Sequence, residues 1–125
     1  MGIRAMSGEY TGFSSAGVDF RGKRLRLDDL IIANPSATFF LQAEEECNLG
    51  GCIHPGDILV VDRAADIVHG SLVVAVVQGE MVLRQVVNRR GRSFLGSSHL
   101  RDEHCDQSEN AIWGKVIYVL HQVSP

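Results

Sequence analysis

The stretch that decides the fold is Ile58-Leu59-Val60-Val61-Asp62, which directly follows the turn sequence His54-Pro55-Gly56-Asp57. Four consecutive apolar residues after a Pro-Gly turn have the length and composition of a buried β-strand. Because such a run does not alternate polar with apolar residues, it is typical of a strand covered on both faces. We therefore expect a central strand here, covered either by its own chain or by a second copy in a dimer.

Similar segments extend from this strand in both directions, with short turns between them. Turn sequences such as His69-Gly70, Gln78-Gly79-Glu80 and Arg89-Arg90-Gly91-Arg92 separate the later segments. Short apolar or β-branched runs at regular spacing indicate a mainly β fold. The expected further strands cover residues 38–42, 71–78, 81–87, 93–95 and 112–123, and a polar loop covers residues 97–109.

The part of the chain before the first expected strand differs in composition. Residues 1–24 are small and polar, so we interpret them as a flexible N-terminal arm. Residues 25–34 predict one short amphipathic helix, which Pro35 ends because the residue before a proline avoids the helical region. The expected organisation is an arm over residues 1–24 and one folded domain over residues 25–125.

Length and charge limit the possible functions. The chain has 125 residues, with 12 Lys and Arg against 15 Asp and Glu, giving a net charge of −3. This size suits one domain, and the chain lacks the clustered basic residues that bind phosphate backbones. Nothing before residue 25 is long enough for a helix-turn-helix, so we expect no sequence-specific DNA binding. With no apolar run near about 20 residues and no signal peptide, we expect a cytoplasmic protein without membrane contact.

The three cysteines are candidate metal ligands. An odd count of three argues against a disulfide framework in a reducing compartment. The spacing Cys47-x4-Cys52-x-His54 is not a common zinc pattern, and only His104-Cys105 offers a second close pair. We therefore expect no metal site and no cofactor, and interpret Cys47 and Cys52 as partly buried thiols beside a Gly-Gly turn.

Cys47 is also a candidate catalytic nucleophile. A reactive thiol needs a nearby cation, a helix N-terminus or a histidine partner. Here the preceding residues are Glu44-Glu45-Glu46, whose carboxylates favour the neutral thiol. Because three consecutive acids point to different sides, we interpret them as a solvated acidic edge and not as a paired-acid active site.

Several motifs together resemble a known family. Asn34-Pro35-Ser36-Ala37-Thr38-Phe39-Phe40 and Pro55-Gly56-Asp57-Ile58-Leu59-Val60-Val61-Asp62 are followed by His69-Gly70, Gly79-Glu80 and Trp113-Gly114-Lys115-Val116-Ile117-Tyr118-Val119. This set resembles the UmuD branch of the LexA/UmuD family of self-cleaving serine–lysine peptidases, over about residues 11–123. UmuD-type proteins are accessory subunits of the bacterial SOS mutagenesis polymerase.

The resemblance implies a LexA/signal-peptidase-like fold of several curved β-sheets with one short N-terminal helix. It also implies a homodimer that cuts its own arm when stimulated by a RecA filament on single-stranded DNA. The shortened dimer of such proteins binds a UmuC-type Y-family polymerase and enables synthesis across DNA lesions. The chemistry uses a serine nucleophile, a neutral lysine as general base and backbone amides that hold the oxyanion.

The family's functional positions carry different residues here. The nucleophile position falls on Cys47, the general-base position on Arg84, and the self-cleavage bond on Thr11-Gly12, with only ten residues before it. Arginine does not lose its proton in proteins, so Arg84 cannot act as the base. We therefore expect a degenerate peptidase that keeps the fold and the dimer but has lost self-cleavage.

Two alternatives remain open from the sequence. One is a live cysteine variant in which Cys47 attacks and another group, with His54 the nearest candidate, takes the proton. The other is a decoy or regulatory module that forms mixed dimers with an active UmuD-type or repressor-type peptidase.

Overall fold

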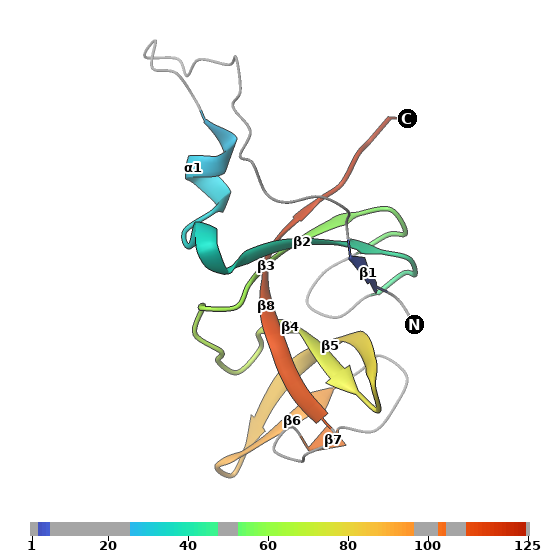
Figure 1. Ribbon diagram of the computed structural model, residues 1–125. Helices are drawn as coiled ribbons and strands as arrows, with labels where there is room; N and C mark the ends of the chain where they lie inside the picture. The colour runs from blue at the N-terminus through green and yellow to red at the C-terminus, as the bar shows by residue number, and fades with distance from the viewer. Residues whose placement is uncertain (1–2, 6–25, 48–52, 97–102, 105–109, 125) are drawn as a thin grey trace.

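Strand β8 (Asn110–Leu120) organises the fold because different strands pair with its two ends. The computed structural model describes residues 3–5, 26–47, 53–96, 103–104 and 110–124 (Figure 1). The C-terminal half of β8 pairs with β3 (Ile58–Asp62), and its N-terminal half pairs with β4 (Leu72–Val77). Both pairings are antiparallel, so one long strand joins the two halves of the sheet.

The other elements extend the sheet outward from these three strands. Their bounds are β1 (Ile3–Ala5), α1 (Leu27–Ile31), the 3-10 helix η1 (Pro35–Ala37), β2 (Thr38–Ala43), β5 (Glu80–Arg89), β6 (Arg92–Gly96) and β7 (Glu103–His104). The described residues form one eight-stranded sheet in the order β1-β2-β3-β8-β4-β5-β6-β7, with every neighbouring pair antiparallel.

Two irregularities bend this sheet where β8 passes from one half to the other. The pairing register shifts between Val60 and Val61 on β3 and between Val74 and Ala75 on β4. Bulges of this kind increase the local twist of a strand pair. Strands β1 and β5 contact each other although four strands separate them in the sheet order. The sheet is therefore strongly curved, with β1 to β3 around one end of β8 and β4 to β7 around the other (Figure 1).

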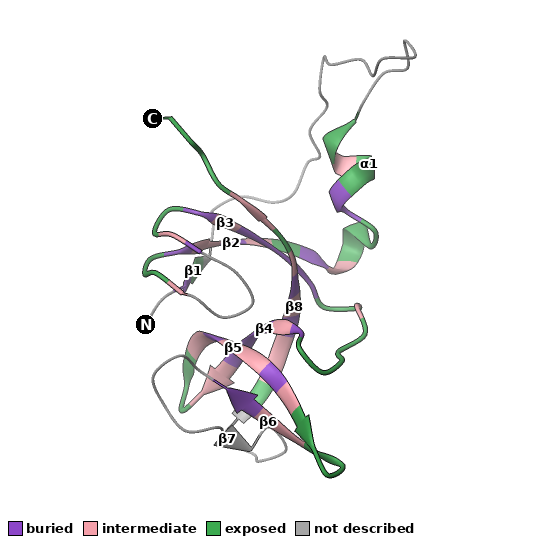
Figure 2. Cartoon of the chain, turned by 180° about the vertical axis from the view of Figure 1, so that it is seen from behind, coloured by how far each residue is buried: buried purple, intermediate pink, exposed green. Residues whose placement is uncertain are grey.

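The core lies inside this curve, and Figure 2 shows buried residues along β3 and β4. Leu59 and Val61 pack in the largest cluster together with Val74, whereas Val73 and Ala75 point to a second cluster with Val86 and Leu95. All of these residues are between 0 and 2 % exposed. At about 25 cal/mol per Å² of buried apolar surface, this inner packing is the main stabilising contribution to the fold.

Helix α1 covers the remaining face of β3. Ile31 and Ile32 pack against Val60, with Phe40 and Leu120 at the edge of the cluster. The expectation that this strand is buried on both faces is confirmed, and the chain itself supplies both covers. Burial of Ile58–Asp62 is therefore not an argument for a dimer.

The mainly β prediction is confirmed, while several details differ from the expectation. The strands are hydrogen-bonded into one curved sheet, where several sheets were expected. The helix is shorter than predicted, because only Leu27–Ile31 is helical. The expected loop over residues 97–109 contains strand β7, and β8 ends at Leu120, before the predicted end at residue 123.

The N-terminal segment shows another difference. Ile3–Ala5, which the composition placed in a flexible arm, pairs with β2, and Ile3 is 6 % exposed within the core. The rest of the predicted arm, with Thr11 and Gly12, lies outside the described residues, so the arm stays a prediction. Among the described helices, none has the length and apolar character required to cross a membrane.

Candidate functional site

Cys47, which the resemblance predicts at the family's nucleophile position, lies at the edge of the core. Its amide donates to the Ile53 carbonyl at 3.0 Å, and the Ile53 amide donates to the Cys47 carbonyl at 2.8 Å. The thiol is free and half-buried, and it packs against the largest core cluster. The preceding residues Glu44, Glu45 and Glu46 are all exposed, as expected for a solvated acidic edge.

Arg84, which the resemblance predicts at the general-base position, lies in the middle of β5 opposite Val73 of β4. It is half-buried, and its Nη1 donates to the carbonyl of Leu83 at 2.9 Å. Because side chains alternate along a strand, Leu83 and Arg84 leave β5 on opposite faces. Leu83 belongs to the cluster against which Cys47 packs, whereas Val86, on the face of Arg84, belongs to the second cluster.

No hydrogen bond joins the side chains of Cys47 and Arg84 in the part of the chain that the structure describes. Of the other residues singled out in the sequence, Cys52 and Cys105 lie outside the described residues, and His104 lies on β7. His54, the proposed alternative base, is directed toward Asp57 and His121.

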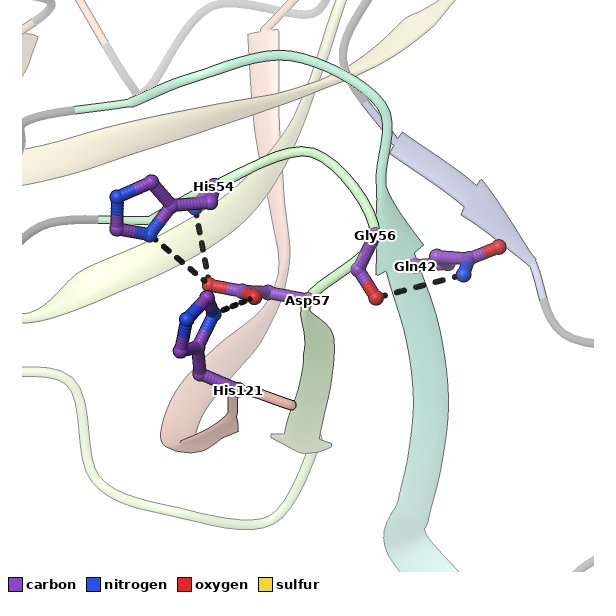
Figure 3. Close-up of polar contacts among 5 residues, drawn as sticks. All are labelled: Gln42, His54, Gly56, Asp57 and His121. Carbon is purple, nitrogen blue, oxygen red and sulfur yellow. Dashed lines mark hydrogen bonds and ion pairs between the residues drawn. The ribbon is translucent and has the colours of Figure 1, made fainter. Parts of the chain in front are cut away.

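His54, Asp57 and His121 form a cluster that the sequence analysis did not anticipate (Figure 3). The turn His54–Asp57 positions two of them. Gly56 has a φ of +92°, which glycine adopts without strain, and the Asp57 amide donates to the His54 carbonyl at 3.1 Å. The turn is tied to β2 by hydrogen bonds from the Gly56 amide to the Ala43 carbonyl and from the Ala43 amide to the Asp57 carbonyl.

His121 reaches the cluster through the register of β8 on β3. Leu120 is paired with Ile58 in an antiparallel ladder. The residue after Leu120 therefore lies beside the residue before Ile58, which is Asp57. The side chain of His121 is 49 % exposed, but its Nδ1 lies 2.6 Å from Asp57 Oδ1.

The carboxylate of Asp57 is the centre of this cluster. Its side chain is only 3 % exposed, and Oδ2 accepts a hydrogen bond from the His54 amide at 2.9 Å. The His54 Nδ1 atom lies 3.8 Å from the same oxygen, and the two imidazole centroids are 4.9 Å apart. Figure 3 shows both rings turned toward the carboxylate.

The ionisation of Asp57 follows from these contacts. Burial by itself raises the pKa of this carboxyl, but the hydrogen bonds from His54 and His121 and the charges of both imidazoles act in the opposite direction. The net result is a pKa below the usual value of 3.8. The carboxylate is therefore charged at neutral pH.

Besides stabilising the fold, the three side chains of this cluster can bind a metal ion. Each of the three residues offers one atom that can bind a metal ion, and these atoms lie within 4.8 Å of one another. A shared carboxylate between two imidazoles can also orient the ring nitrogens. The only sequence signal for the cluster was the His-Pro-Gly-Asp turn, which predicted the backbone but not the contact with His121.

Comparison with known proteins places the whole fold in one family. Residues 7–117 match the family model described as Peptidase S24-like. Protein ImpA of Salmonella typhimurium is 34 % identical over 112 residues, which cover 89 % of this chain and 77 % of that protein. Protein ImpA of Shigella flexneri matches with the same figures.

A second relative is similar over a shorter stretch. Protein MucA of Escherichia coli is 37 % identical over 78 residues, which cover 62 % of this chain and 53 % of that protein. The family match and the extent of these identities confirm the resemblance that the sequence motifs indicated. The chain therefore belongs to the Peptidase S24-like family, as a UmuD-like member of its LexA/UmuD group.

Proposed function

We propose that this protein is an accessory protein of SOS-induced translesion DNA synthesis, which acts as a homodimer, binds a UmuC-type Y-family polymerase and does not cleave itself. The observation that carries the proposal is the family match over residues 7–117, and the predicted assignment of Cys47 and Arg84 to the nucleophile and base positions supports the loss of cleavage. The fold is kept, whereas the pair of residues needed for the chemistry is not.

Loss of self-cleavage follows from the chemistry of Arg84. A general base must be neutral before it accepts a proton, and the guanidinium stays protonated in proteins. Its Nη1 already donates to a backbone carbonyl, which is the behaviour of a fixed cation. Cys47 packs against apolar side chains and follows three exposed acids, and no cation is among the neighbours that the structure gives for it in the described residues.

Exposed aromatic and aliphatic side chains support the homodimer. Phe39 is 42 % exposed and packs edge-on against Trp113, with ring centroids 5.3 Å apart. The Arg63 guanidinium lies 4.5 Å from the Trp113 centroid and extends this surface. Aromatic and arginine side chains of this kind are enriched in protein interfaces, and we assign this patch to contact with a second copy of the chain.

The partners are tested by co-purification and mass measurement. A UmuC-type polymerase is expected to co-purify with the tagged full chain, and light scattering is expected to give the mass of a dimer at micromolar concentration. Phe39→Glu is expected to weaken the dimer at least about tenfold, since a buried charge at an interface is costly. Val123→Glu, at a residue 90 % exposed, is the matched control and should leave the mass unchanged.

The outcomes separate the proposal from its alternatives. Retention of a repressor-type peptidase in place of the polymerase would support the decoy function and contradict the accessory function. A monomer mass for the parent protein would contradict the homodimer. A RecA filament is a further expected partner, and a self-cleaved product in its presence would contradict the loss of cleavage.

A further inference from the structure

We propose that His54, Asp57 and His121 form a Zn²⁺-binding site, which fastens the end of β8 to the turn before β3. The sequence spacing predicted no metal site because it drew attention to the cysteines, whereas these three donors come together only in the fold. The proposal rests on the described residues alone and does not depend on the function proposed above.

The donor types match the preferences of zinc. Zn²⁺ binds imidazole nitrogens at about 2.0–2.1 Å and carboxylate oxygens at about 2.0–2.2 Å, usually in a tetrahedron. Neighbouring ligand atoms in such a tetrahedron are about 3.4 Å apart. The His121 Nδ1 atom lies 2.6 Å from Asp57 Oδ1, and the His54 Nδ1 atom lies 3.8 Å from the other oxygen, Oδ2. The three candidate ligand atoms lie within 4.8 Å of one another, so the side chains would have to rotate to bring all three to the required separation.

The carboxylate is prepared for this role before any ion arrives. The Asp57 side chain is buried, and the amide of His54 donates to its Oδ2 atom at 2.9 Å. A backbone hydrogen bond to a ligating carboxylate fixes its orientation and so strengthens metal binding. The negative charge also attracts a divalent cation to a position between the two rings.

Both histidines are accessible from solvent. Their side chains are 43 % and 49 % exposed, whereas the Nδ1 atom of His54 is itself buried. The fourth coordination position can hold water. The site would connect residues 64 positions apart in the chain, because His121 follows β8 and Asp57 precedes β3. Since the ion binds only when both elements are in place, it stabilises the folded state by linkage.

The test is titration of the untagged full chain with ZnCl₂ after treatment with a chelator, followed by calorimetry. We expect one Zn²⁺ per chain and a weaker affinity, by roughly tenfold or more, in His54→Asn and in His121→Asn. His69→Asn is the matched histidine control, because His69 accepts a hydrogen bond from the Asn88 amide outside the cluster. Cys47→Ser is the thiol control, and both controls should bind Zn²⁺ as the parent does.

Two results would overturn the proposal. One is an unchanged Zn²⁺ affinity in the double variant His54→Asn, His121→Asn, which is expected to fold because both side chains are largely exposed. The other comes from Co²⁺ substitution. Intense near-ultraviolet thiolate absorption that persists in the double variant would assign the metal to cysteine ligands.

Discussion

The nucleophile and base positions, Cys47 and Arg84, and the cluster of His54, Asp57 and His121 differ in how they are built. The first pair stands where the resemblance predicts the family's nucleophile and base, yet Cys47 contributes packing and backbone hydrogen bonds, and Arg84 donates to the carbonyl of Leu83. In the cluster only Asp57 lies within one of the family motifs, yet the two imidazoles of His54 and His121 converge on its buried carboxylate. A family match therefore identifies the fold, while chemistry has to be sought in the contacts that the fold creates.

The largest expected effect is the recovery of self-cleavage when both family residues are restored. In the double variant Cys47→Ser, Arg84→Lys, a lysine can serve as the base, and general-base catalysis typically contributes about 10²–10⁴-fold in rate. Cleavage should be fastest near pH 10, close to the ordinary lysine pKa of about 10.4. Gel electrophoresis and mass spectrometry would follow a product that begins at Gly12.

The single variant Cys47→Ser is the control for this experiment, and it should remain intact because Arg84 still occupies the base position. If the double variant also remained intact at alkaline pH, the arginine would not be the reason that cleavage is absent.

The next effect concerns stability at the cluster. Asp57→Asn removes the charge that accepts hydrogen bonds from the His54 amide and from His121. Hydrogen bonds to charged groups contribute about 1.5–3 kcal/mol, so the free energy of unfolding should fall by about 2 kcal/mol. Urea denaturation in the presence of a chelator would measure this change, and a change below about 0.5 kcal/mol would show that the cluster does not stabilise the metal-free fold.

A smaller effect should distinguish the two histidines. His121→Asn removes a 2.6 Å contact with Asp57, but its side chain is half exposed, so the expected cost is about 1 kcal/mol. His54→Asn keeps the backbone amide that binds Asp57, so its cost should be only a few tenths of a kcal/mol. Urea denaturation without metal would measure both variants. An equal loss in the free energy of unfolding for His121→Asn and His54→Asn would contradict the expected difference between the two histidines.

The smallest effect is expected at the nucleophile position. Cys47→Ala removes one half-buried sulfur from the edge of the core and leaves both backbone hydrogen bonds with Ile53 in place. The free energy of unfolding should change by about 0.5 kcal/mol, much less than for a fully buried side chain. A loss above about 2 kcal/mol in the free energy of unfolding would contradict this expectation, because it would show that the Cys47 side chain stabilises the fold as much as a fully buried side chain.

Local patterns in the sequence were sufficient to predict most of the sheet. The apolar run Ile58–Asp62 coincides with β3, and the Val-rich segment around β4 lies between turns that the glycines mark. Strand β1 was missed because three residues surrounded by small polar ones carry no periodic signal. Its pairing with β2 and the burial of Ile3 are tertiary effects.

The cluster could not be predicted for a related reason. The turn before β3 follows from Pro55 and Gly56, but the neighbour of Asp57 depends on the register between β3 and β8. That register shifts by one residue at Val60/Val61, and no local pattern indicates such a shift. The motifs predicted the family positions of Cys47 and Arg84, whereas only the strand pairing showed that His121 reaches Asp57.

The most direct test of the account is the intact mass of the parent protein after incubation with RecA, a nucleotide analogue and single-stranded DNA. The account predicts one species at the full mass of the chain, because Arg84 cannot act as a general base. A product that begins at Gly12 and disappears in Cys47→Ala would contradict the account, since it would show that Cys47 is a working nucleophile.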